Sequence, residues 1–80
     1  MKVQTTSQIN RERVATLITQ EFSIPVFRTL RFRTADQDTV RVDVLEHELV
    51  NELADFFSND ANDEFVVGRT EAYAIYLQVA

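Results

Sequence analysis

The sequence predicts an α+β fold in which two helices pack on one face of an antiparallel sheet. Two segments repeat their hydrophobic residues every three to four positions, as amphipathic helices do, and each precedes segments in which hydrophobic and polar residues alternate. The order is α-β-β-α-β-β, so we expect two hairpins and three to four strands. A hydrophobic content of 45%, with one Gly and one Pro in 80 residues, indicates a single folded domain.

The first helix is predicted to begin near Asn10, whose side chain can cap it. It should end at Pro25, because Ile24 before the proline is pushed out of the helical region. The hydrophobic residues inside this segment share one helix face and should be buried. They are Val14, Leu17, Ile18 and Phe22. Residues 1–8 are mostly polar and are expected to be loose.

Two strands are predicted next, at residues 26–34 and 39–44, because hydrophobic and polar residues alternate in both segments. The four residues between them, 35–38, are polar apart from Ala35 and should form the turn of a hairpin. One face of this hairpin would then be hydrophobic and would pack against the helices, while the other would be polar.

The hairpin should gather three arginines on its outer face. The hydrophobic residues of both strands must lie on the same face, and this condition restricts the register. Each register that satisfies it places Arg41 opposite either Arg33 or Arg31. Like charges in this position repel each other, so we expect a neutralising group. Asp43 is the internal candidate, and a nucleic-acid phosphate or another partner is the external one.

Residues 43–59 give the clearest helical pattern. Asp43 can cap this helix, and Glu46 stands three residues later, as in a capping box. The predicted buried side consists of Leu45, Leu49, Leu53, Phe56 and Phe57. The opposite side is acidic and consists of Glu46, Glu48, Glu52 and Asp55. Favourable helix-dipole interactions do not explain Glu52 and Asp55, because these residues are far from the positive end of the helix.

The last segment is predicted to form a second hairpin, with a strand at 65–67, a turn at Gly68 and Arg69, and a strand at 72–80. The final strand is expected to place Tyr73, Ile75, Leu77 and Val79 on one side. A terminal helix is the alternative, because the segment also contains good helix formers. If the segment is a strand, its hydrophobic edge could pair with a second copy and form a homodimer.

Charge is distributed unevenly along the chain, although the net charge is −5. Residues 1–35 hold six basic and two acidic residues, which gives +4. Residues 36–64 hold ten acidic residues and one basic residue, which gives −9, and residues 65–80 are neutral. Such asymmetry bears on the choice of partner and on the rate of encounter.

The sequence favours a non-enzymatic protein without a metal or cofactor. His47 and Glu48 begin a pattern that resembles a zinc-protease helix, but Asn51 stands where the second His is required. The chain has no other His and no Cys, and its single Gly cannot build a phosphate-binding loop. The longest hydrophobic run, residues 72–77, is too short for a membrane span or a signal peptide, so we expect a cytoplasmic protein.

We therefore predict a protein-binding module that docks on the basic groove of a nucleic-acid-handling protein. Small phage-encoded inhibitors and other DNA mimics act in this way, and the chain could be such an inhibitor or adaptor from a phage or mobile element. The steps between Glu48, Glu52 and Asp55 are roughly 5–6 Å by helix rise, which approximates the spacing of successive phosphates. The predicted partner-binding residues are Glu46, Glu48, Glu52, Asp55, Asp36 and Asp38.

The alternative is a nucleic-acid-binding module that uses the arginine-rich face of the sheet. Cations on such a face can follow the phosphates of a single strand, and an aromatic ring can stack on a base. The residues assigned to this role are Arg31, Arg33, Arg41 and Phe27. The acidic segment at 36–64 opposes this function, because it repels phosphate.

Overall fold

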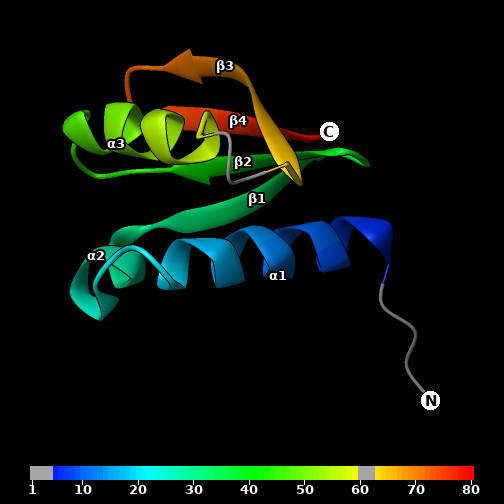
Figure 1. Ribbon diagram of the computed structural model, residues 1–80, viewed down its shortest axis with the longest axis horizontal. Helices are drawn as coiled ribbons and strands as arrows, with labels where there is room; N and C mark the ends of the chain where they lie inside the picture. Colours follow the sequence, from blue (N-terminus) through cyan, green and yellow to red (C-terminus); the bar gives the residue numbers. More distant parts are fainter. Residues whose placement is uncertain (1–4, 60–62) are drawn as a thin grey trace.

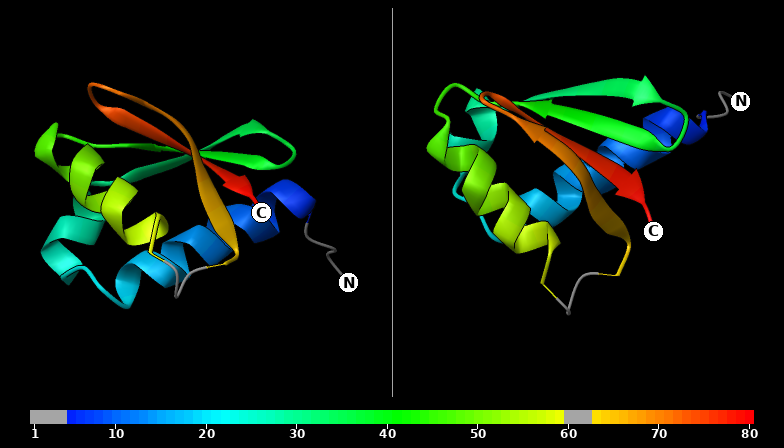
Figure 2. Two further views of the ribbon diagram at one scale, coloured as in Figure 1. Left: turned by 45° about the horizontal axis from the view of Figure 1, so that its top comes forward. Right: turned by 90° about the horizontal axis from the view of Figure 1, so that it is seen from above.

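The computed structural model describes residues 5–59 and 63–80 and confirms the predicted α+β fold (Figure 1). Its elements are α1 (Thr6–Thr19), α2 (Ile24–Thr29), β1 (Arg31–Asp36), β2 (Thr39–Asp43), α3 (Glu48–Phe57), β3 (Phe65–Glu71) and β4 (Ala74–Val79). The four strands form one antiparallel sheet in the order β1-β2-β4-β3. Helices α1 and α3 cover the same face, the inner face, with α1 over β1 and β2 and α3 over β3 and β4 (Figure 2).

Helix α1 begins earlier than the sequence pattern predicted. Thr5 caps it, since the backbone N–H of Gln8 donates to Oγ1 of Thr5 (3.2 Å) and the N–H of Thr5 donates to Oε1 of Gln8 (2.9 Å). The expected cap, Asn10, instead donates from Nδ2 to the carbonyl of Gln37 (3.1 Å) and holds the β1–β2 turn against the helix. Residues 5–8 are therefore ordered rather than loose, while residues 1–4 lie outside the described part.

Helix α1 ends at Thr19, so the expectation that it continues to Pro25 was wrong. Pro25 instead belongs to a second helix, α2, which begins at Ile24. It lies in the first turn of α2, where proline lacks only an N–H that has no helical partner. The predicted strand at 26–34 was therefore wrong in its first half. The spacing of Val26, Phe27 and Leu30 also fits one helical turn, so a short hydrophobic pattern could not distinguish the two structures.

The first hairpin has one of the two expected registers, with Arg33 opposite Arg41 and Phe32 opposite Val42. The turn of the second hairpin was placed wrongly. Gly68 lies within β3, which continues to Glu71, and the turn follows at residues 72–73. The pairing of β3 shifts between Val67 and Arg69, so a bulge replaces the expected turn.

The final segment is a strand, as the alternation indicated, but it is not at an edge. β4 pairs with β2 on one side and with β3 on the other. Both of its backbone edges are therefore used within the chain. The edge that the expected homodimer would have required is not available for pairing.

One hydrophobic core joins the two helices to the inner face of the sheet. Val14, Leu17 and Ile18 of α1 are buried in it, as predicted. The core also contains Val40, Val42, Val50, Leu53, Phe57, Phe65, Ile75 and Leu77. Phe22, which follows α1, packs against this core while partly buried, and its ring meets that of Phe56 edge to face.

The start of α3 differs from the prediction in two ways. The cap position is His47, which makes no side-chain capping bond, and Asp43 is instead the last residue of β2. Leu45, expected in the buried stripe, lies in the connection before α3 and is 72% exposed. Both errors have one cause. Strand β2 continues to Asp43, and the N–H of Val44 still donates to the carbonyl of Tyr73 (2.9 Å), so the helix begins later than predicted.

Candidate functional site

The acidic ridge consists of Glu48, Glu52 and Asp55, which lie four and three residues apart on α3. All three are exposed, because the opposite side of the helix supplies Val50 and Leu53 to the core. The described residues offer them no arginine or lysine partner, and the one charge contact is between Glu48 and His47 at 3.4 Å. The ridge is therefore an ordered row of carboxylates that faces solvent.

Two of the other predicted acids lie elsewhere. Asp36 ends β1 and Asp38 belongs to the turn that follows, which Asn10 holds against the first half of α1. This turn is at one end of the sheet, and the connection from β2 to α3 is at the other (Figure 1). Glu46 is exposed in that connection, close to the start of the ridge. The structure thus groups Glu46 with the ridge and separates Asp36 and Asp38 from it.

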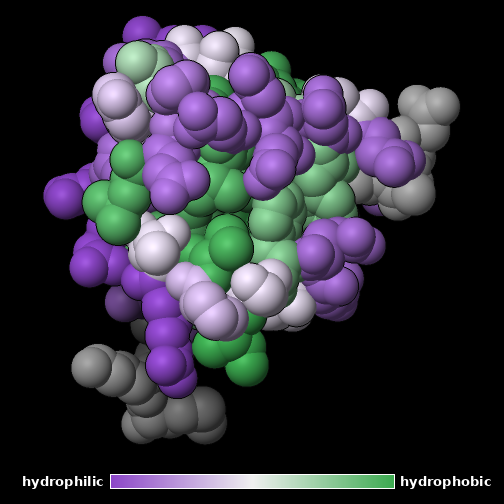
Figure 3. All heavy atoms as spheres, turned by 90° about the vertical axis from the view of Figure 1, so that its left-hand side faces the viewer, coloured by the Kyte–Doolittle hydropathy of each residue, from purple (hydrophilic) through white to green (hydrophobic). Residues whose placement is uncertain are grey.

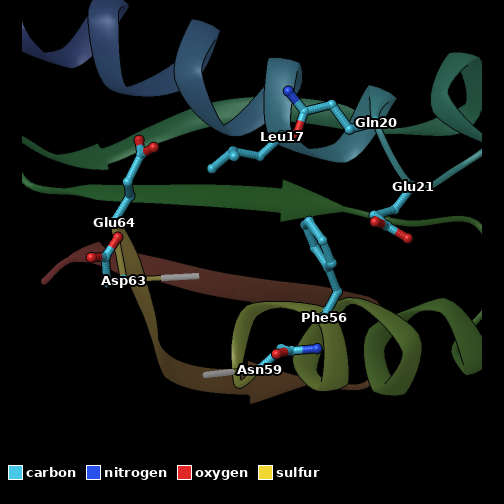
Figure 4. A pocket seen from close by; sticks show the side chains of 7 residues that line it. All are labelled: Leu17, Gln20, Glu21, Phe56, Asn59, Asp63 and Glu64. Carbon is cyan, nitrogen blue, oxygen red and sulfur yellow. The ribbon is translucent and has the colours of Figure 1, made fainter. Parts of the chain in front are cut away.

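A groove lies between the C-terminal part of α1 and the C-terminal end of α3 (Figure 4). Its volume is about 270 Å³. Leu17 and Phe56 extend into it from the two helices and form its hydrophobic part (Figure 4). The polar residues around it are Gln20, Glu21, Asn59, Asp63 and Glu64. Asn59 follows Asp55 by four residues, so the acidic ridge leads towards this groove.

One carboxylate of this groove is paired. Arg13 of α1 donates from Nε and Nη2 to the two oxygens of Glu64, at 2.6 and 2.5 Å, in a bidentate ion pair. The hydrogen bond from Arg13 lowers the pKa of Glu64 below its ordinary value and raises the pKa of Arg13. This pair could not be predicted from the sequence, since its members are far apart in the chain and no local pattern joins them.

The arginine row crosses the outer face of the sheet and consists of Arg33, Arg41, Tyr76 and Arg69. They come from β1, β2, β4 and β3 and are neighbours in the register. The guanidinium of Arg69 lies 4.1 Å from the centre of the Tyr76 ring, and that of Arg41 lies 5.6 Å from it. The alternation of side chains along β4 was enough to predict Tyr76 on the outer face. Arg69 could not be predicted there, because the bulge in β3 interrupts the alternation of its side chains.

Internal carboxylates neutralise part of this row, as the hairpin register required. Asp43 accepts from Nε of Arg33 (2.8 Å) and from Nε of Arg41 (2.7 Å), and the second bond raises the pKa of Arg41. Arg41 also donates to the hydroxyl of Tyr76 (3.1 Å), which donates to Glu71 (3.0 Å). Asp43 therefore performs the neutralising role that the sequence assigned to it, although it does not cap α3.

The other two residues of the nucleic-acid hypothesis are placed less favourably. Arg31 donates from Nη1 to the carbonyls of Arg28 (3.3 Å) and Leu30 (3.1 Å) at the start of β1. Phe27 belongs to α2, and its ring packs on that of Phe32 with the centroids 5.6 Å apart. Phe27 thus contributes to the core and does not accompany the arginines.

Hydrophobic side chains reach the surface at the end of the molecule where α2 meets the β2–α3 connection (Figure 3). Ile24 is 66% exposed and Leu45 is 72% exposed. Leu45 also lines a depression of about 230 Å³ with Pro25, Val26 and Leu49. Glu46 borders this depression, so hydrophobic and acidic surfaces are adjacent here.

Within residues 5–59 and 63–80, no three His, Cys, Asp or Glu side chains are grouped so that they could hold a metal ion. His47 is exposed and its ring lies against Tyr73, with centroids 6.2 Å apart. The helices in the described part are all too short or too polar to cross a membrane. No protein-family model, curated protein or solved structure matches the chain.

Proposed function

We propose that the protein is a non-enzymatic binding module whose acidic ridge docks on a basic protein. The observation that carries this proposal is that Glu48, Glu52 and Asp55 face solvent without an arginine or lysine partner among the described residues. In contrast, Asp43 and Glu64 each bind arginine. Exposed carboxylates at regular spacing attract a basic surface and accelerate its encounter with the protein.

The groove between α1 and α3 supports the same function, because it can anchor a basic side chain. An arginine or lysine could lay its hydrophobic stem over Leu17 and Phe56 and direct its charge towards Glu21 or Asp63, which lie at opposite ends of the groove. Anchors of this kind, buried in a pocket beside complementary charge, dominate the energetics of many interfaces. The ridge would then supply attraction and the groove would supply specificity.

The partner that fits best is a nucleic-acid-handling protein with a basic groove, and a small phage-encoded inhibitor would act in this manner. The ridge repeats at roughly 5–6 Å, which is close to the spacing of successive phosphates. Basic grooves that bind phosphates would accept such a row of carboxylates in their place. The proposal places the chain in the cytoplasm, where such partners act.

The test begins with capture of the partner from a host lysate on the immobilised intact chain. Its affinity for the purified chain is then measured over a series of salt concentrations. A variant with Glu48→Gln, Glu52→Gln and Asp55→Asn should bind more weakly and with a shallower dependence on salt. The matched control removes the same charge at Glu12, Asp36 and Asp38, away from the ridge, and should bind like the wild type.

An equal affinity and an equal salt dependence in the ridge variant would refute the proposal, provided that circular dichroism shows the variant to be folded. A control variant that loses affinity as strongly as the ridge variant would also refute it. That result would mean that net charge, rather than the position of the ridge, governs binding.

Binding of single-stranded nucleic acid is the second candidate function, and the arginine row favours it. Each of the four strands contributes one residue to this row. Arg69 adds a cation that the sequence pattern did not predict on this face. A gel shift with a single-stranded oligonucleotide at low salt tests this function. Removing the charges of Arg33, Arg41 and Arg69 should abolish the shift, whereas removing those of Arg11, Arg13 and Arg28 should not. Absence of a shift at low salt would refute it.

A further inference from the structure

Two bulges lie on opposite edges of the sheet and beside the same part of it. The pairing of β1 shifts between Thr34 and Asp36, and that of β3 shifts between Val67 and Arg69. Between them, Thr39 of β2 pairs with Gln78 of β4. A bulge bends its strand and redirects the neighbouring side chains, so each edge can curve around this central pair.

The result is the sheet hollow, a concavity of about 340 Å³ on the outer face. Its polar residues come from all four strands, and they are Asp36, Thr39, Arg69, Tyr76 and Gln78. Gly68 leaves room for the side chain of Gln78, because a Cβ at this position would lie 2.9 Å from Cδ of Gln78. The hollow is on the opposite side of the sheet from α1 and α3, so it is separate from the acidic ridge.

Thr39 is the feature of the hollow that the fold alone does not explain. It is 6% exposed and is the one polar residue among the buried residues of the described chain. Its hydroxyl makes no hydrogen bond to any described residue, and the residue lines the hollow. Buried hydroxyls normally have a hydrogen-bond partner, and those without one tend to mark binding sites.

The charges of the hollow are one cation and one carboxylate. The guanidinium of Arg69 lies over the Tyr76 ring, 4.1 Å from its centre, and has no carboxylate partner among the described residues. Asp36 uses Oδ1 to accept the backbone N–H of Asp38 (2.9 Å), and its second oxygen has no such bond. The amide of Gln78 and the hydroxyl of Thr39 lie between these two charged walls in the register.

We propose that the sheet hollow binds a free amino acid. The carboxylate of the ligand would face Arg69 and its ammonium would face Asp36, while Thr39 and Gln78 would hydrogen-bond its polar atoms. A ligand with one charge of each sign matches the two walls, whereas a phosphate group would be repelled by Asp36. The hollow is large enough for a small amino acid but not for an extended polymer.

The test is a titration of the intact chain, monitored by two-dimensional amide NMR. The probes are glycine, glutamine, acetate, methylamine and inorganic phosphate, each added separately. Saturable shifts at Thr39, Gly68, Arg69 and Gln78 should occur with the amino acids alone. The variants Arg69→Gln and Thr39→Val should each weaken this binding by roughly tenfold or more, since each removes a hydrogen bond to a ligand with charged groups. The matched control, Arg33→Gln, is on the same face but outside the hollow and should leave binding unchanged.

Three outcomes would overturn the proposal. The first is the absence of saturable shifts with any amino acid, and the second is an equal response to acetate or phosphate. The third is wild-type affinity in both variants. Arg69 is exposed, so its substitution does not threaten the fold. Neither variant alters the acidic ridge, so a negative result here leaves the binding of a basic partner to be decided by its own experiment.

Discussion

Replacing Thr39 with valine should stabilise the unliganded protein. The two side chains have nearly the same shape, and both favour strands. Thr39 is 6% exposed and its hydroxyl has no hydrogen-bond partner among the described residues. A buried hydroxyl without a partner costs about 1–3 kcal/mol, and valine removes that cost while it adds a buried methyl group. We expect the free energy of unfolding to rise by about 1 kcal/mol, because the open side of the hollow reduces the penalty.

Urea unfolding followed by circular dichroism measures this change. The midpoint should rise while the slope with denaturant stays the same, and a gain of about 1 kcal/mol should raise Tm by about 4–8 °C in a domain of this size. Thr34→Val is the control, because the hydroxyl of Thr34 accepts a hydrogen bond from Nη1 of Arg11 (2.8 Å). This control should be neutral or slightly destabilising. A destabilised Thr39→Val variant would refute the reasoning, since it would mean that the hydroxyl is satisfied in the folded protein.

Three further predictions concern stability. Thr5→Ala should destabilise the protein by about 1 kcal/mol in urea unfolding, because it removes the cap of α1; no effect would place the start of the helix elsewhere. Leu45→Ala should change stability by less than about 0.5 kcal/mol, whereas Leu53→Ala should cost about 2–5 kcal/mol, and equal costs would contradict their opposite exposures. Arg13 lowers the pKa of Glu64, so this pair stabilises the fold above the ordinary pKa of glutamate and ceases to do so as the pH falls through the lowered pKa. The stability difference between wild type and Arg13→Gln should therefore be present at pH 6 and shrink on acidification, and a constant difference would exclude the ion pair as its cause.

The sequence was sufficient to predict the elements whose hydrophobic pattern extends over many residues. The spacing of hydrophobic residues identified α1, α3 and the strand character of β4, and side-chain parity restricted the first hairpin to two registers, of which one is observed. It also anticipated that Asp43 would neutralise the arginines. These inferences succeeded because each depends on contacts between near neighbours in the chain or on one repeated period.

The remaining features depend on contacts between distant segments. Pro25 suggested the end of the first helix, but it lies in the first turn of α2, a short helix whose Phe27 packs against Phe32 of β1. The dipeptide of Gly68 and Arg69 suggested a turn, whereas β3 accommodates it as a bulge against Gln78. The acidic ridge could be predicted from a single helix, while the sheet hollow could not, because its residues come from four strands.

The central position of β4 has a consequence for the order in which the protein can fold on the ribosome. Because β4 separates β2 from β3, the sheet cannot close until β4 has been synthesised. Until then, β2 keeps one unpaired backbone edge and the hydrophobic side of α3 lacks the paired strands that it covers in the sheet, a combination that promotes association with other nascent chains. Removal of the final few residues should accordingly yield aggregation rather than a smaller native domain.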